Sequence, residues 1–133
     1  MKDKVMKVGI MPRQDYMKRT LAIANGDYKP REDEPKIWFE SIQSLAQVLS
    51  TDNQKLLQTI IQHEPRSITQ LESLTRRNKS NLSRTLKTME RYGIVELKKE
   101  KNRISPRVKV TDFNVEFGLN YSSPVSNGAP LSS

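Results

Sequence analysis

The chain has 133 residues, about the length of one domain, and its 35% hydrophobic and 29% charged residues are typical of a soluble globular protein. It has no cysteine, which excludes a disulfide framework and a thiolate metal site, and it has no apolar run of the about 18 residues needed to cross a bilayer. The N-terminus lacks the apolar core of a signal peptide, so we expect a cytoplasmic, nucleoid-associated protein with no membrane partner.

The formal net charge of +8 is concentrated in the middle of the chain. Residues 66–109 hold thirteen Lys and Arg against four Glu, whereas the remainder holds ten basic and eleven acidic residues. The middle segment therefore carries +9 and the rest carries −1. This concentration indicates a polyanionic partner for residues 66–109.

The first fifty residues predict a strand over 4–10 and a helix that begins at Pro12 and ends near Ala24. Its narrow apolar stripe consists of Met17, Leu21 and Ala24. The polar, proline-interrupted segment 27–35 predicts a loop, in which we expect the acidic cluster 32–34 to be solvated. Residues 37–39 predict a short apolar anchor, whose Trp38 packs in the core or in a dimer seam.

Four helices are expected next, and each has its own start signal. Ser41 caps the first, Thr51 with Gln54 forms a capping box for the second, and Ser67 with Gln70 forms one for the third. Asn78 caps the fourth and longest helix, 79–92, which Gly93 ends in a left-handed conformation.

Residues 94–98 and 108–111 predict a β-hairpin with a basic tip over 99–105. Residues 113–119 allow one more strand, and 120–133 predict a disordered tail.

Three short helices followed by a basic hairpin is the order of a winged helix-turn-helix. We therefore expect a mainly α fold with a small β component. The winged helix-turn-helix would occupy 51–119, and an N-terminal strand-helix extension, 1–50, would form a dimerisation region. In such a fold the third helix enters the major groove of DNA, and the hairpin reaches an adjacent groove or the backbone.

The helix 79–92 has the two faces that this role requires. Leu82, Leu86 and Met89 share one face, and the opposite face is basic and hydroxyl-bearing. Arginine suits guanine and asparagine suits adenine, so residues of the first turns are predicted to read bases: Ser80, Asn81, Ser83 and Arg84. Phosphate or groove contacts are predicted for Ser67, Arg76, Arg77, Lys79, Lys87, Arg91, Lys98, Lys99, Lys101, Asn102, Arg103 and Arg107.

Two simpler explanations of these charges stay open. Cationic residues near the end of a helix are favoured by the helix dipole, and lysines on an outer strand discourage aggregation. The sequence has no motif for catalysis, metal binding or cofactor binding. His63 is the only histidine and has no partners spaced for a metal site or a catalytic base, so we expect no enzyme activity, no metal and no cofactor.

The run from Ser67 to Val110, SITQLESLTRRNKSNLSRTLKTMERYGIVELKKEKNRISPRVKV, resembles the winged-helix core of MarR-type transcriptional regulators. The resemblance covers residues 52–112 and includes the Asn-Leu-Ser-Arg-Thr-Leu-Lys stretch, the Tyr-Gly-Ile-Val exit and the basic wing. The complete layout resembles a smaller group of prokaryotic DNA-binding proteins, some of which are considered antitoxins because they lie beside toxin genes. MarR-type proteins dimerise through long terminal helices. This chain instead ends in a short polar tail, so a dimer must be built by residues 4–49.

The resemblance implies a homodimeric transcriptional regulator, a repressor, that binds double-stranded DNA. The alternative from another class is an antitoxin that binds a toxin protein and autoregulates its operon. RNA ranks third, because the major groove of A-form RNA is too deep and narrow for a helix.

Overall fold

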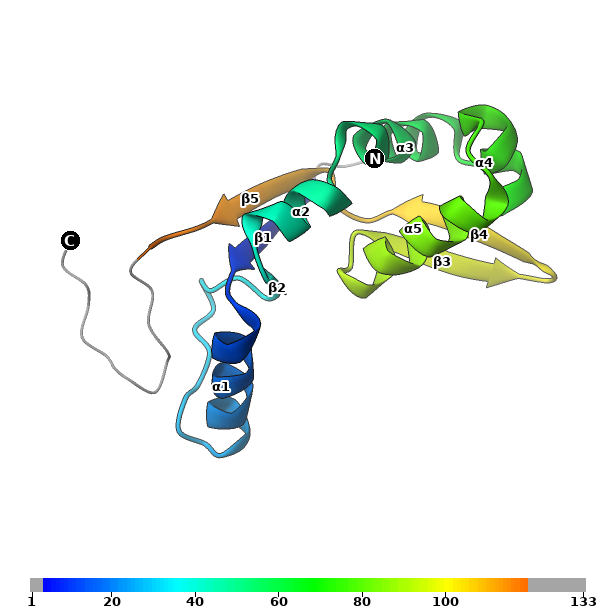
Figure 1. Ribbon diagram of the computed structural model, residues 1–133. Helices are drawn as coiled ribbons and strands as arrows, with labels where there is room; N and C mark the ends of the chain where they lie inside the picture. The colour runs from blue at the N-terminus through cyan, green and yellow to red at the C-terminus, as the bar shows by residue number, and fades with distance from the viewer. Residues whose placement is uncertain (1–3, 120–133) are drawn as a thin grey trace. The chain divides into compact units, whose positions relative to one another are not determined.

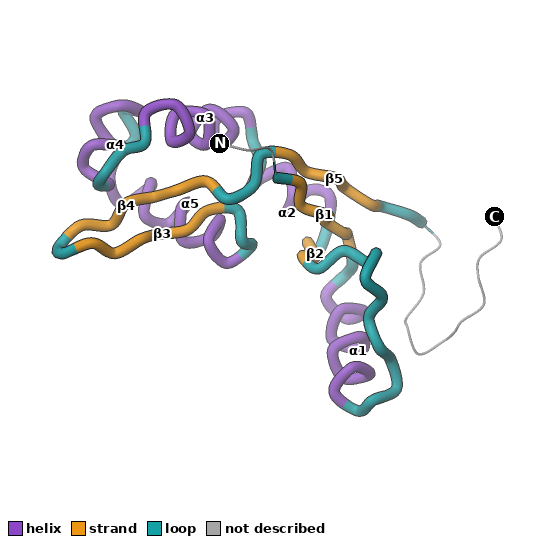
Figure 2. Tube along the Cα trace, turned by 180° about the vertical axis from the view of Figure 1, so that it is seen from behind, coloured by secondary structure: helices purple, strands orange, loops and turns teal. Residues whose placement is uncertain are grey.

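The computed structural model describes residues 4–119, which form five helices and five strands, with helix the larger part (Figures 1 and 2). The predicted tail, 120–133, lies outside the described residues. In chain order the elements are β1 (Val5–Ile10), α1 (Arg13–Ala24), β2 (Ile37–Phe39), α2 (Ile42–Val48), α3 (Thr51–His63), α4 (Ile68–Thr75), α5 (Lys79–Arg91), β3 (Val95–Glu100), β4 (Arg103–Val108) and β5 (Asp112–Glu116).

The described residues fall into two compact units, with divisions between residues 6 and 7, between 45 and 46 and between 112 and 113. We call residues 4–6 and 46–112 the hairpin unit, and residues 7–45 and 113–119 the sheet unit. The sequence placed its domain boundaries instead at residues 50 and 119. No helix in the described part of the chain is both long enough and apolar enough to span a membrane.

The hairpin unit packs α3, α4 and α5 with the antiparallel strands β3 and β4. The core is formed by one apolar stripe from each helix together with inward-facing strand residues, and all its members are nearly inaccessible to solvent: Leu56, Leu57, Ile60, Leu71, Leu82, Leu86, Met89, Ile94, Val95 and Val108. Ile61 and Leu74, which fit the same helical periodicity, lie exposed at 40% and 41%. Each of α3 and α4 thus buries only a narrow stripe of its surface, and Ile61 and Leu74 lie outside it.

Four helices begin at polar side chains, as expected, but one N-cap differs from the prediction. Ser41, Ser67 and Asn78 accept from backbone N–H groups three residues on, at 2.8–3.0 Å. Helix α3 is capped by Ser50 and not by Thr51, since the Asn53 N–H donates to Ser50 Oγ at 3.2 Å. Gln54, expected to complete the capping box, donates to the Leu49 carbonyl. Two adjacent hydroxyl residues satisfy the same pattern, so the pattern alone did not identify the cap.

The sheet unit is built on a three-stranded sheet of order β2-β1-β5, in which β1 runs parallel to β2. Strand β5 is the additional strand that the sequence allowed, and it pairs beside β1. The paired residues Val8, Ile10 and Phe39 are buried and form the core of this unit. Alternation of side chains shows that a segment is a strand but not which partner it takes.

The sheet unit contains a buried ion pair that contacts two aromatic rings. Arg19 Nη2 donates to Glu34 Oε1 at 2.8 Å, and both side chains are about nine-tenths buried. The guanidinium lies over the Trp38 ring at 5.1 Å and the Tyr28 ring at 5.8 Å, within the range of a cation–π contact. The prediction of a solvated acidic cluster is therefore wrong for Glu34, whose pairing with a distant residue has no local signal.

Helix α1 turns a charged residue inward and its apolar stripe outward. Its buried residues are Arg19 and Ala22, whereas Met17 and Leu21 of the apolar stripe are 54% and 62% exposed. The Arg19 side chain buries its aliphatic stem and pairs its charge with Glu34, and it thereby occupies the inner face of the helix.

Gly9 is paired with Trp38 across the two strands, and the indole ring lies over it. A Cβ at residue 9 would lie 2.3 Å from Trp38 Cζ3, closer than atoms tolerate.

We predict that Gly9→Ala lowers the free energy of unfolding by about 1–3 kcal/mol, because the ring must move away from the sheet. Thermal denaturation measures this change. Gly118→Ala is the matched control, since nothing lies within 4 Å of its added methyl group; equal melting temperatures for the two variants would contradict the packing described.

Candidate nucleic-acid interface

Helix α5 combines a fully buried face with an exposed basic face. Leu82, Leu86 and Met89 have no accessible surface and fix the rotation of the helix about its axis. Asn78 Oδ1 accepts from the Asn81 N–H at 2.8 Å and starts the helix, and Gly93, at φ +76°, follows its last turn. The side chains opposite the core are exposed: Ser80, Arg84, Lys87 and Arg91.

The four predicted base-reading residues do not lie in equivalent environments. Arg84 is exposed and has the reach of a long side chain. Ser80 is exposed, but its hydroxyl donates to Asn78 Oδ1 at 3.1 Å. Ser83 and Asn81 are half-buried on the two flanks of the basic face, and Asn81 accepts from Arg77 Nε at 2.8 Å. Of the four, Arg84 therefore combines exposure with the longest reach.

Arg77, expected to contact phosphate, is committed to contacts within the protein. Its guanidinium is half-buried and donates to the side chains of Asn53, Asn81 and Thr85, from Nη1, Nε and Nη2 respectively. The neighbouring Arg76 is exposed and adopts a left-handed conformation, φ +62°, at the C-cap of α4. Of the two arginines in this turn, only Arg76 presents its charge to solvent.

The β3–β4 hairpin has a shorter turn than the sequence predicted. Pairing extends from Val95–Val108 to Glu100–Arg103, so the turn consists of Lys101 and Asn102 alone. Lys101 has φ +54°, in the region that glycine prefers. The exposed polar residues of the hairpin include most of those predicted to contact DNA: Lys98, Lys99, Lys101, Asn102 and Arg103.

Arg107 differs from the other predicted contacts of the hairpin. Its Nη1 donates to the carbonyls of Pro65 and Pro106, at 2.9 and 2.8 Å, and the side chain is half-buried. The buried Ser105 hydroxyl donates to the same Pro65 carbonyl at 3.3 Å. Arg107 thus fastens β4 to the turn between α3 and α4, and its guanidinium is not directed to an external phosphate.

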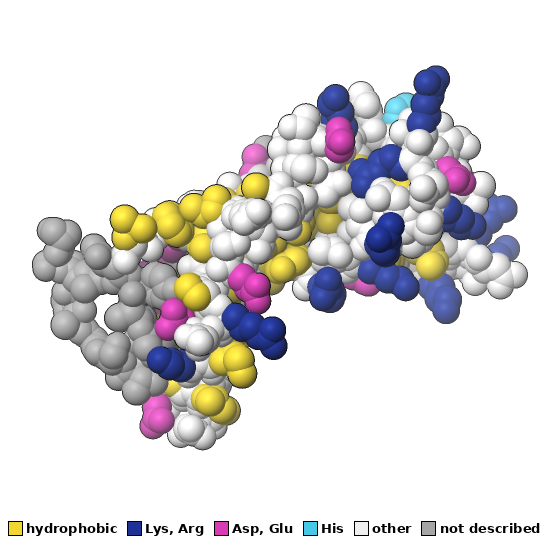
Figure 3. Space-filling view, viewed as in Figure 1, with side chains coloured by type: hydrophobic (Ala, Val, Ile, Leu, Met, Phe, Trp, Pro, Cys, Tyr) yellow, Lys and Arg dark blue, Asp and Glu magenta, His cyan; other side chains and the backbone are white. Residues whose placement is uncertain are grey.

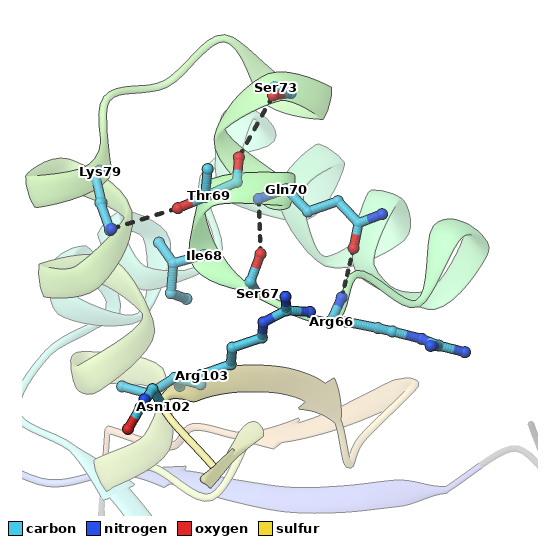
Figure 4. A pocket seen from close by; sticks show the side chains of 10 residues that line it. Arg66, Ser67, Ile68, Thr69, Gln70, Ser73, Lys79, Asn102 and Arg103 are labelled. Atoms are coloured by element: carbon cyan, nitrogen blue, oxygen red, sulfur yellow. Dashed lines mark hydrogen bonds between the residues drawn. The ribbon is translucent and has the colours of Figure 1, made fainter. Parts of the chain in front are cut away.

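A cationic pocket of about 580 Å³ lies between the first turn of α4, the start of α5 and the hairpin turn (Figure 4). Lys79 Nζ reaches across to Thr69 Oγ1 at 3.4 Å, and Arg103 extends from β4 toward Ser67. The Ser67 hydroxyl accepts from the Gln70 N–H, and Gln70 Oε1 accepts from the Arg66 N–H. All ten described lining residues are neutral or basic: Arg66, Ser67, Ile68, Thr69, Gln70, Ser73, Lys79, Asn102, Arg103 and Ile104.

The pocket brings together four residues that the sequence predicted separately, Ser67, Lys79, Asn102 and Arg103. It adds Arg66 and Thr69, which sequence reasoning did not select. Arg66 precedes the N-cap of α4, a position where the helix dipole does not favour a cation. Its unfavourable place was the one signal in the sequence that could have identified it as a pocket residue. Figure 3 shows Lys and Arg side chains gathered on the hairpin unit.

The chain belongs to the protein family HVO_A0114, whose model matches residues 48–115, about half of the chain. The matched residues contain α3, α4, α5 and the whole β3–β4 hairpin. Comparisons with curated proteins and with solved structures find no match.

Proposed function

We propose that the protein is a sequence-specific double-stranded DNA-binding regulator of transcription, built on a winged helix-turn-helix. The observation that carries this proposal is the exposed face of α5, which bears Ser80, Arg84, Lys87 and Arg91 opposite a fully buried apolar stripe. A helix of this width fits the major groove of B-DNA, and arginine presents a planar fork to guanine. Glu90, the acidic residue of α5, lies beside the buried face and away from this surface.

The hairpin and the cationic pocket supply contacts to the DNA backbone in this proposal. Lys101, Asn102 and Arg103 form a small cationic tip, suited to a narrow minor groove or to phosphates beside it. The pocket offers Lys79, Arg103 and the Ser67 hydroxyl to one phosphate of the strand that borders the groove. Lys87 and Arg91, further along α5, meet phosphates at the groove wall, as does Arg76 from the turn before it.

A homodimer completes the proposal, because one reading helix spans only a few base pairs and two half-sites give useful specificity. The sheet unit holds fewer of the described residues than the hairpin unit, yet it carries seven of the eleven exposed large hydrophobic side chains. An excess of exposed apolar side chains on one part of a molecule is typical of an interaction surface. These seven are Tyr16, Met17, Leu21, Ile42, Val115, Phe117 and Leu119.

Arg84→Ala is predicted to remove the preference for the cognate duplex while leaving non-specific binding. The loss should be about 1–3 kcal/mol of discrimination, the value of one bidentate contact with guanine. Titration of cognate and random duplexes, after selection of a cognate site from a random library, measures it. Lys87→Ala is the control, from which we expect equal losses on both duplexes; equal losses for Arg84→Ala would remove its base-reading role.

Lys101→Gly is predicted to weaken binding to all duplexes and to reduce the log–log salt slope by about 0.9, the value of one phosphate contact. Stability should hold or rise, since glycine relieves the left-handed backbone at φ +54°. Glu64→Gly, at φ +47° on the C-cap of α3, gains the same relief outside the interface and should leave the salt slope unchanged. An unchanged slope for Lys101→Gly would show that the hairpin turn does not contact DNA.

The double variant Met17→Glu, Leu21→Glu is predicted to be a monomer at micromolar concentration, where the wild-type chain is a dimer, because two charges would enter an apolar interface. Sedimentation equilibrium on the full chain measures the change. Ile61→Glu, at an exposed apolar position of the hairpin unit, is the control and should leave the dimer intact. A monomeric wild-type chain, or a dimer that survives both charges, would contradict this assignment of the interface.

A further inference from the structure

We infer that Arg77 is a positioning residue that fixes the orientation of the Asn81 amide, so that α5 presents N–H donors at this position and selects guanine. This inference rests on the proposed function, in which α5 lies in the major groove. It assigns to Arg77 a role in base selection that it exerts through Asn81 and without touching DNA.

The guanidinium of Arg77 is held by three side chains from two helices. Nε donates to Asn81 Oδ1 at 2.8 Å and Nη2 to Thr85 Oγ1 at 3.1 Å, one turn apart on α5. Nη1 donates to Asn53 Oδ1 of α3 at 3.0 Å. Three contacts on one planar, rigid group leave Arg77 a single position relative to α5.

The direction of each hydrogen bond in this cluster is set by groups with only one possible role. The carbonyls of Gln47 and Val48 can only accept, and Asn53 Nδ2 donates to them at 3.3 and 3.0 Å. Asn53 must therefore turn its Oδ1 to Arg77. A guanidinium has donors and no acceptor, so Asn81 must also present its oxygen to Arg77 and its nitrogen away from it.

A reversed Asn81 amide would place its NH₂ group against Arg77 Nε–H, two donors facing each other. It would also lose a hydrogen bond to a charged donor, which is stronger than a neutral one. The amide is thus fixed in one orientation before any DNA is bound. Within residues 4–119 its Nδ2 has no hydrogen-bond partner, so both of its N–H groups are available to a ligand.

This orientation changes the base expected at Asn81. Free asparagine pairs with adenine by offering its oxygen to N6–H and its nitrogen to N7. In Asn81 the contact to Arg77 occupies one lone pair of Oδ1 and turns this oxygen toward the arginine, so the side chain presents its two N–H groups, which match the two acceptors of guanine, N7 and O6. The adenine preference that the residue type suggested is therefore replaced by a preference for guanine.

Asn81→Asp tests the inference directly, because aspartate keeps the contact to Arg77 as an ion pair but has no N–H. We expect an equal or higher melting temperature. In selections from a random duplex library, the guanine at one position should give way to cytosine, whose N4–H₂ donates. Affinity for the wild-type duplex should fall on the order of tenfold or more.

Arg77→Met is the second variant. It should weaken the base preference at the position that Asn81→Asp alters and leave the preferences at other positions unchanged, and Arg77→Lys should restore part of the lost preference. Thr85→Val is the matched control, since it removes one partner of Arg77 but leaves Asn81 held, and its base preference should equal the wild type. Should Arg77→Met fail to fold, Asn81→Asp decides alone.

Three outcomes overturn the inference: adenine preferred at the position that Asn81→Asp alters, no change of base preference in Asn81→Asp, or a uniform loss on all duplexes with a smaller salt slope in Arg77→Met. The last would make Arg77 a phosphate contact. Failure of the proposed function looks different, because the wild-type chain would then select no duplex at all.

Discussion

The burial of Leu82, Leu86 and Met89 is the contact on which the hairpin unit depends. These side chains have no accessible surface, and they pack α5 into the core with α4 and β3. Removing one leucine from such a site costs about 2–5 kcal/mol, a large share of the stability of a small domain. Because the buried stripe fixes the rotation of α5, it also determines which residues face outward. The direction of Arg84 is therefore set by the core and not by contacts of Arg84 itself.

The parts of this unit that follow from local chemistry were predictable from the sequence. Apolar residues at helical spacing located α5, Asn78 and Gly93 located its ends, and alternation located the hairpin. The internal hydrogen bonds of Arg77 and Arg107 could not be predicted, because their partners, Asn53 and the Pro65 carbonyl, lie 24 and 42 residues away in the chain. A charged residue in a basic segment looks the same whether its charge serves the fold or an external partner, and only the tertiary contacts separate the two.

The sheet unit shows a stronger version of the same difficulty. A buried arginine occupies the inner face of α1, and Met17 and Leu21 occupy the outer face. Hydrophobic periodicity assumes that the core takes apolar residues, and here a paired guanidinium that contacts two aromatic rings takes that place. Gly9 belongs to this arrangement, since the space left by its missing side chain receives the indole of Trp38. No single residue of this cluster has a local sequence signal for its role, because its contacts join segments that are distant in the chain.

The stacking of Trp38 gives the protein an internal optical label. It is the only tryptophan of the chain, and it lies in the sheet unit under the Arg19 guanidinium. Its fluorescence therefore follows the sheet unit alone, whereas α3, α4 and α5 of the hairpin unit contribute most of the helical circular dichroism. Two spectroscopic signals recorded in one denaturation thus report on two separate parts of the chain. Coincident curves would mean that the units unfold as one cooperative body, and displaced curves would give the order in which they come apart.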